Sequence, residues 1–326
     1  MPNDSRRTST DAEVDVLITA YNADRYLAAA IESIQKQTLE HWRLIVVDDC
    51  STDNTPRILE RFCAQDSRIL ALKGRHQGIA AAANRGLEKC TAPYIARLDA
   101  DDIALPHRLA LQKDYLDANP NTLAIGTDVQ LIDESAKPIR LRRVPYSHEA
   151  VLKTLGTRNC IYHPSCMIRA GDLREIGGYR EQFRNSEDYD LWLRMSERGN
   201  LANLPNVATL YRKHDTQVTS KANTHRLTLY SVAAALDYFV RRYGVPAEPV
   251  TIDEGNNDSI SRGLAQLYSL DLDPMDLLAI NRHAMRLLRQ ANALGAQARL
   301  ELTQRMLPRL SLLERIKHQL YSVVKA

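Results

Sequence analysis

Three carboxylates within four residues follow directly on a short apolar run. The run covers residues 94–98, and the acids after it are Asp99, Asp101 and Asp102. On an extended backbone, side chains two residues apart project to the same side, so we expect Asp99 and Asp101 to converge while Asp102 points away. Converging carboxylate oxygens suit a hard divalent cation such as Mg²⁺ or Mn²⁺, which completes its shell with phosphates and water. The stretch therefore predicts a metal and phosphate site, with a merely solvated acidic turn as the alternative.

A second acidic pair, Glu187 and Asp188, begins a segment in which Leu191 and Met195 have helical spacing. Acids in the first turn of a helix are stabilised by the helix dipole. A carboxylate pair fixed on a rigid element also suits general-base chemistry. The segment therefore predicts either a proton acceptor or simply a well-capped helix.

The elements that must position these acids alternate in the first half of the chain, which is typical of a parallel sheet covered by helices. We expect strands over residues 14–19, 43–48, 69–72, 94–98 and 123–132. We expect one helix capped by Asn22 or Asp24, and further helices that start at Thr55–Pro56, at Gly78 and at residue 106. The carboxyl ends of parallel strands meet at one edge of a sheet, where ligands bind. Residues 19–22, 48–49 and 99–102 are therefore expected to face one site.

Length, charge and cysteine usage limit the class of protein. With 326 residues, of which 44% are hydrophobic and 25% charged, the chain can form one large or two modest domains. A formal net charge of +3 gives no argument for nucleic acid as a partner. Five cysteines without a C-x-x-C pair indicate free thiols in a reducing compartment. The N-terminus lacks the apolar core of a signal peptide and no apolar run approaches the ~20 residues of a spanning helix, so we expect a cytoplasmic protein, at most peripheral on the inner face of a membrane.

Two common nucleotide-binding motifs are absent from the sequence. No G-x-G-x-x-G follows the first expected strand, and no P-loop lysine motif is present. Both absences disfavour nicotinamide and ATP-type pockets. Residues 49–60 mimic part of a calcium loop, but Asn54 stands where that loop needs glycine and Pro56 interrupts it.

Seven short stretches, in order along the chain, resemble those of the inverting glycosyltransferases of family 2, which have the GT-A fold. They are residues 19–22, 46–53, Gly78 with 84–86, 99–102, 163–165, 187–188 and 211–214. The match covers roughly residues 14 to 220. The resemblance implies an α/β fold of GT-A type, with a Rossmann-like, mostly parallel sheet, flanking helices and a helical C-terminal region.

The same resemblance implies roles for individual residues. Asp188 is the implied catalytic base, with Glu187 as its rival, and Asp101 with His214 is implied to hold a divalent metal, Mn²⁺ or Mg²⁺. The implied nucleotide-binding residues are Thr19, Tyr21, Asn22, Asp49, Gly78, Asn84 and Asp99. This chain departs from the family pattern at Ala83, where many relatives have an arginine that offers donors to a diphosphate. It also has His76 in place of asparagine, which leaves His76, Arg75 and Lys73 as candidates for that contact.

The resemblance implies that the chain moves a sugar from a nucleotide-diphosphate sugar to a hydroxyl group, with UDP as the expected nucleotide. The expected acceptor is a saccharide or lipid-linked saccharide used in cell-envelope polysaccharide biosynthesis. Asp188 would take the acceptor proton, and a cation at Asp101 would offset the charge of the leaving diphosphate. Two other classes remain open. A nucleotidyltransferase should carry a Gly-rich, Arg-containing loop after its first strand, and a non-catalytic nucleotide-sugar-binding protein need not keep both acidic sites.

The expected organisation has four parts. These are a tail (1–13), a nucleotide-sugar-binding half (14–105), an acceptor-binding and catalytic half (106–220) and a helical C-terminal region (221–326) with a linker at 245–259. Residues 298–326 have apolar residues at helical spacing with basic residues interleaved. Such a helix suits an anionic membrane surface. Packing on its own domain or on a second subunit is the more common role of an apolar helix face.

Overall fold

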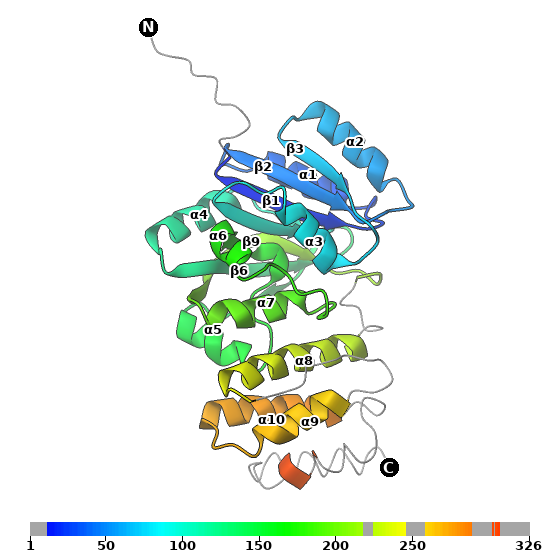
Figure 1. The fold of residues 1–326 in the computed structure, drawn as a ribbon. Helices are drawn as coiled ribbons and strands as arrows, with labels where there is room; N and C mark the ends of the chain where they lie inside the picture. Colours follow the sequence, from blue (N-terminus) through cyan, green and yellow to red (C-terminus); the bar gives the residue numbers. More distant parts are fainter. Residues whose placement is uncertain (1–11, 218–223, 246–257, 289–301, 303, 307–326) are drawn as a thin grey trace. The chain divides into compact units, whose positions relative to one another are not determined.

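The computed structural model describes residues 12–217, 224–245, 258–288, 302 and 304–306 (Figure 1). The expected tail up to residue 11, most of the expected linker and nearly all of the expected basic helix over 298–326 lie outside the described residues. The chain divides into two compact units, residues 1–152 with 159–217, and residues 153–158 with 218–326. All residues that the sequence predicts to do chemistry lie in the first unit.

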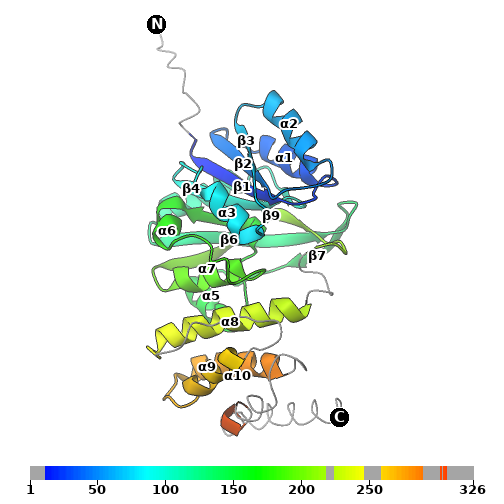
Figure 2. The same ribbon diagram turned by 45° about the vertical axis from the view of Figure 1, so that its right-hand side comes forward.

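One mixed sheet of nine strands, counted over the described residues, forms the centre of the first unit (Figure 2). The strands are β1 (Val14–Ala20), β2 (Trp42–Asp48), β3 (Ile69–Lys73), β4 (Tyr94–Asp99), β5 (Ile103–Ala104), β6 (Thr122–Ile132), β7 (Pro138–Arg142), β8 (Met167–Arg169) and β9 (Asn200–Arg212). Their order is β3-β2-β1-β4-β8-β6-β9-β5, with β7 paired to β6. Strands β1 to β4 pair in parallel, as predicted, whereas β8 pairs antiparallel with β4 and β6.

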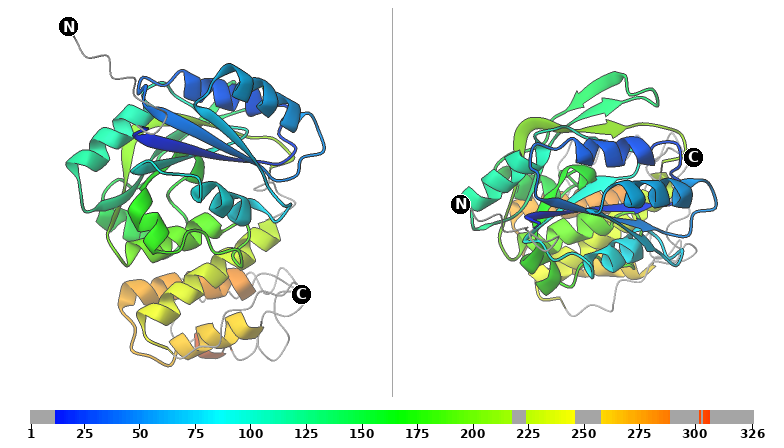
Figure 3. Two further views of the ribbon diagram at one scale, coloured as in Figure 1. Left: turned by 45° about the horizontal axis from the view of Figure 1, so that its top comes forward. Right: turned by 90° about the horizontal axis from the view of Figure 1, so that it is seen from above.

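Helices cover both faces of this sheet (Figure 3). They are α1 (Leu27–Gln35), α2 (Thr55–Gln65), α3 (Ile79–Leu87), α4 (Arg108–Ala118), α5 (His148–Leu155), α6 (Ala170–Glu175) and α7 (Glu187–Ser196), with a 3-10 turn η1 (His163–Ser165). Alternate strand residues such as Val16 and Val46 pack with α1 and α2. On the opposite face, α3 approaches so closely that a Cβ on Gly86 would come within 2.2 Å of Leu17 Cδ1. The predicted α/β fold with flanking helices is confirmed.

The predicted cap of the first helix is wrong. Helix α1 starts after Tyr26, and neither Asn22 nor Asp24 occupies its cap position. Asn22 Oδ1 instead accepts a hydrogen bond from the Thr52 N–H (2.9 Å), and Asp24 Oδ2 accepts one from the Asn54 N–H (3.4 Å). Both side chains therefore connect the loop after β1 to the loop after β2.

The second unit is helical, as predicted for the C-terminal region. Helices α8 (Thr224–Arg242), α9 (Asp258–Leu267) and α10 (Pro274–Leu288) bury an apolar core that includes Val232, Leu264 and Ile280. Among the residues that the structure describes, no helix combines the length and the apolar composition needed to span a membrane.

Candidate functional site

The three carboxylates that follow β4 lie together. One oxygen from each of Asp99, Asp101 and Asp102 lies within 4.8 Å of the others. The prediction that Asp102 points away is wrong, because β4 ends at Asp99 and the chain then turns, with the Asp102 N–H donating to the Asp99 carbonyl (3.2 Å). The alternation of side chains along a strand therefore does not extend to these acids.

Asp102 is almost completely buried, with 1% of its surface exposed. Its Oδ1 accepts a hydrogen bond from the Arg212 N–H (2.7 Å), whereas its Oδ2 has no hydrogen-bond partner among the described residues. Burial, reinforced by the charges of Asp101 and Asp99, raises the pKa of Asp102 well above its usual value. A buried oxygen without a partner, next to two further carboxylates, fits a cation that prefers oxygen ligands.

His214 reaches the same cluster from the far end of β9. Its Nε2 lies 2.8 Å from Asp101 Oδ2, and its Nδ1 lies 2.8 Å from Thr216 Oγ1. The pairing of β5 with β9, in which Ile103 lies opposite Leu210, brings this segment back to the acids. Metal-bound imidazoles commonly use their second nitrogen for such an orienting contact. The structure thus brings together Asp101 and His214, the two residues that the sequence predicts to hold a metal.

The first turn of α7 presents the second acidic pair. Asp188 Oδ2 accepts a hydrogen bond from Asn159 Nδ2 (2.7 Å), and Oδ1 accepts one from the Tyr189 N–H (2.7 Å). Glu187 is 4% exposed, and its Oε2 has no partner among the described residues. Burial and the neighbouring Asp188 charge raise the pKa of Glu187 to about 8, and burial raises the pKa of Asp188 to about 6. At neutral pH the pair therefore keeps a proton on Glu187 and leaves Asp188 ionised.

The buried side chain of Arg97 supports the acids that follow β4. This fully buried side chain lies on the same face of the sheet as that of Leu17, because Arg97 of β4 is paired with Leu17 of β1. The Arg97 guanidinium is 3.5 Å from Asp99 Oδ1. It also donates hydrogen bonds to the Leu17 carbonyl, to Thr19 Oγ1 (3.3 Å) and to His163 Nε2 (3.4 Å).

Asp99 responds electrostatically to both acidic groups. Partial burial raises the pKa of Asp99 to about 6, although 36% of its side chain is exposed to solvent. The positive charge of Arg97 lowers this pKa, and the negative charges of Asp101 and Asp188 raise it further. The acids after β4 and the acids of α7 therefore lie close enough to interact electrostatically.

An exposed aromatic surface lies at the ends of β1 and β3. The ring of Tyr21, which is 50% exposed, lies 4.7 Å from the ring of His76 between centroids. Asp49 holds the loop that carries His76, since its buried carboxylate accepts hydrogen bonds from the main-chain N–H groups of Arg75 (3.1 Å), Gln77 (3.3 Å) and Gly78 (2.9 Å). His76 (φ +56°) and Gly78 (φ +95°) have the left-handed backbone that this turn requires.

Thr19, Tyr21, Asn22, Asp49 and Gly78 thus gather at the carboxyl edge of the sheet, as the sequence predicts. Asn84 differs from these residues. Its Nδ2 donates to the Tyr179 carbonyl (2.8 Å), and its Oδ1 accepts from the Tyr179 N–H (2.9 Å). The side chain is therefore bound to the loop before α7.

Sequence reasoning gave no role to three residues that hold the site. Arg97 supports Asp99, Asn159 orients Asp188, and Arg212 donates from its Nε to the Asp101 carbonyl (2.8 Å). Arg97 gave a usable signal, because it is a lone charge in an otherwise apolar strand. Asn159 gave none, since its function depends entirely on the tertiary fold.

Comparison with known proteins adds independent findings. A family model described as Glycosyl transferase family 2 matches residues 15–177. The putative glycosyltransferase EpsE of Bacillus subtilis (strain 168) is 38% identical over 192 residues, which cover 57% of this chain and 68% of that protein. The O-antigen biosynthesis glycosyltransferase WbnJ of Escherichia coli is 32% identical over 215 residues, covering 64% of this chain and 83% of that protein.

A solved structure agrees with the fold. The structure of S. aureus TarS 1-349 in complex with UDP-GlcNAc matches with a TM-score of 0.58 at 14% identity, covering 94% of this chain and 91% of that chain. The matched family consists of sugar-transferring enzymes, which sets aside the nucleotidyltransferase and the non-catalytic binding protein that the sequence left open.

Proposed function

Because this chain belongs to glycosyltransferase family 2 and is a glycosyltransferase, we propose that it moves a sugar from a nucleotide-diphosphate sugar to an acceptor hydroxyl, with inversion at the anomeric carbon and with a divalent metal. One observation carries this proposal. The oxygens of Asp99, Asp101 and Asp102 lie within 4.8 Å of one another, and the cluster lies close enough to Asp188 for the charge of Asp188 to act on Asp99.

The donor is proposed to bind at the edge formed by β1, β2 and β4, with UDP as its nucleotide. The exposed ring of Tyr21 beside His76 offers a surface on which a base can stack. Asp49 shapes that surface by holding the loop around His76. Support for UDP comes from TarS, whose structure contains UDP-GlcNAc.

The metal is proposed to bind at Asp101, Asp102 and His214, with Asp99 beside it. Carboxylate oxygens with one imidazole fit Mn²⁺ or Mg²⁺, and the buried Asp102 Oδ2 without a partner gives a reason for a cation at this point. A divalent cation bound there would supply positive charge that stabilises the diphosphate as it leaves.

Asp188 is proposed to accept the proton of the acceptor hydroxyl. Asn159 and the Tyr189 N–H orient its carboxylate, and a pKa of about 6 leaves it ionised at neutral pH. The acceptor oxygen bonds to the anomeric carbon as the bond to the diphosphate breaks on the opposite face. One displacement of this kind inverts the anomeric carbon and needs a single base.

The acceptor is proposed to be a saccharide, free or lipid-linked, used in cell-envelope polysaccharide biosynthesis. The name of WbnJ, an O-antigen biosynthesis glycosyltransferase, supports this class. We also propose that residues 14–105 bind the donor and residues 106–220 bind the acceptor, because the aromatic surface lies in the first segment and the Asp188 base in the second.

The test is release of nucleotide diphosphate from a panel of UDP-, GDP- and TDP-sugars, with a saccharide acceptor mixture and with Mn²⁺, Mg²⁺ or EDTA. We expect release from one donor when metal is present, and an anomeric configuration opposite to the donor's in the product. Asp101→Ala should abolish metal-dependent release while the protein keeps its melting temperature, because Asp101 is half-buried and its loss leaves no large cavity. Full turnover in excess chelator would contradict the metal, and release of sugar 1-phosphate in place of nucleotide diphosphate would favour nucleotidyl transfer.

A further inference from the structure

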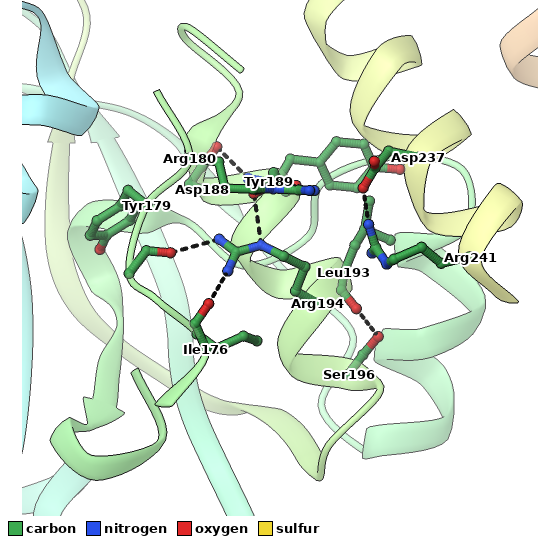
Figure 4. A network of polar contacts seen from close by, with 12 residues as sticks. Ile176, Tyr179, Arg180, Asp188, Tyr189, Leu193, Arg194, Ser196, Asp237 and Arg241 are labelled. Carbon is green, nitrogen blue, oxygen red and sulfur yellow. Dashed lines mark hydrogen bonds and ion pairs between the residues drawn. The ribbon is translucent and has the colours of Figure 1, made fainter. Parts of the chain in front are cut away.

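The loop between α6 and α7, residues 176–180, is bound firmly to α7. Arg194 of α7 donates hydrogen bonds to the carbonyls of Ile176 (2.9 Å) and Gly178 (2.7 Å), as Figure 4 shows. The same guanidinium pairs with Asp190 (2.9 Å), and Asp190 also pairs with Arg180. The loop and the first turn of α7 are therefore connected by buried, charge-assisted contacts, which are stronger than neutral hydrogen bonds.

Asn84 binds this loop from the opposite direction. It lies on α3, which packs on β1 and β2, and its two amide atoms bind the N–H and the carbonyl of Tyr179 at 2.9 and 2.8 Å. Gly178 makes this contact possible, because its φ is +65° and a Cβ there would lie 2.7 Å from Asn84 Oδ1. We name the contact between Asn84 and Tyr179 the loop clasp.

The Tyr179 side chain extends the clasp toward the acids. Its hydroxyl lies 2.8 Å from His163 Nε2, and both side chains are buried. His163 Nε2 also accepts from Arg97 Nε (3.4 Å), and Arg97 is paired with Asp99. The clasp is therefore connected on one side to the acid after β4 and on the other to the first turn of α7.

We infer that Asn84 is a positioning residue for the carboxylates of α7 and does not bind the nucleotide. The inference rests on the proposed function, because it assigns Asn84 to that reaction. Asp190 follows Asp188 by two residues within the first turns of one helix, so a shift of the loop that holds Asp190 also shifts Asp188. Misplacement by about 1 Å can lower a rate by roughly 100-fold.

The experiment compares Asn84→Ala with a matched control, Asn119→Ala. Asn119 also donates from its amide to a main-chain carbonyl, that of Tyr115 (2.8 Å), but it lies at the end of α4. Three quantities are measured on the full chain, namely turnover at saturating donor, the Kd of UDP with Mn²⁺, and amide hydrogen exchange at Tyr179 and at residues 187–190.

For Asn84→Ala we expect turnover to fall by about 10- to 100-fold while the Kd of UDP changes by less than about threefold. Exchange should become faster at the Tyr179 N–H, which loses its acceptor, and at the first turn of α7. Asn119→Ala should change none of these quantities. Asn84→Asp keeps an acceptor for the Tyr179 N–H but places a carboxylate oxygen against the Tyr179 carbonyl, so it should also lower turnover and speed exchange at the first turn of α7.

A weakening of UDP binding by the same factor as turnover would show that Asn84 binds nucleotide and would overturn the inference. Unchanged amide hydrogen exchange at residues 187–190 in Asn84→Ala would also overturn the inference. This measurement does not depend on sugar transfer, so failure of the inference can be distinguished from failure of the proposed function. If Asn84→Ala does not fold, Asn84→Asp gives the test, because it keeps the size of the side chain and removes the hydrogen bond to the Tyr179 carbonyl.

Discussion

Asp188→Asn tests the proposed chemistry most directly, because it removes the proton acceptor and preserves the size of the side chain. Both Asp188 oxygens accept hydrogen bonds in the structure, from Asn159 (2.7 Å) and from the Tyr189 N–H (2.7 Å). An asparagine can accept at only one of these atoms, so one hydrogen bond worth about 1 kcal/mol is lost. Removing a poorly solvated negative charge acts in the opposite direction. We therefore expect little net change in the free energy of unfolding.

The expected effect on turnover is much larger. Loss of a general base lowers a rate by about 100- to 10,000-fold. The Kd of UDP should hardly change, because the proposed nucleotide contacts lie at Tyr21 and the loop held by Asp49. Wild-type turnover should fall as the pH drops below about 6, since the pKa of Asp188 is raised to about 6 and protonation removes the base. The variant should lack the part of this acid limb that protonation of Asp188 causes. Turnover between about pH 5 and 9 and a titration with UDP measure both effects.

Glu187→Gln is the matched variant for this experiment. The pKa of Glu187 is raised to about 8, so Glu187 carries a proton at neutral pH and is not the expected base. Glu187→Gln should therefore keep most of the activity at neutral pH. If Glu187→Gln is inactive while Asp188→Asn is near the wild type, the base is assigned one residue too late. If both variants remain active, another group takes the acceptor proton.

A second prediction for Glu187→Gln and one for Asp49→Ala also follow from the structure. Glu187→Gln should raise the melting temperature more at about pH 9 than at about pH 5. The folded-state pKa of Glu187, about 8, lies above the unfolded value of about 4.3, so the wild type loses stability as the pH rises between these values. Thermal melts at both pH values measure this effect, and an equal shift in melting temperature at both would contradict it. Asp49→Ala leaves three main-chain N–H groups in the loop of His76 without their acceptor, so it should weaken UDP binding by about 10-fold or more in a direct titration; an unchanged Kd would show that this loop is not part of the donor site.

The sequence predicted the parallel half of the sheet to within about one residue at most strand ends, because β1, β2 and β4 are buried on both faces and appear as mostly apolar runs. Strand β9 was not predicted. Its pairing with β6 shifts register between Thr127 and Asp128, where Leu204 and Val207 lie opposite and Pro205 with Asn206 forms an exposed irregularity. A proline within an irregular pattern of apolar and polar residues is typical of a loop. Only the pairing with β6 therefore identifies residues 200–212 as a strand.

The candidate site shows the same division between local and tertiary information. Asp101 and Asp188 could be identified because each lies in an acidic group directly after or within a regular element. The direction of Asp102 could not be predicted, since it depends on where β4 ends and on the N–H of Arg212, 110 positions further along the chain. The partner of Asn84 is 95 positions away, so a motif that suggests a nucleotide contact gave no indication of the loop clasp.

The charge balance of the site explains why the proposed metal and the proposed base should work over the same pH range. Several carboxyl groups share one site, and their pKa values are raised by burial and by one another; they are Asp99, Asp102, Glu187 and Asp188. Arg97, paired with Asp99 at 3.5 Å, offsets only part of this negative charge. Carboxylates must lose their protons before they bind a cation, so metal affinity rises with pH. Because burial and neighbouring carboxylates raise the pKa values of both Asp99 and Asp188, a fall in pH should weaken the proposed metal binding and the proposed base in the same direction.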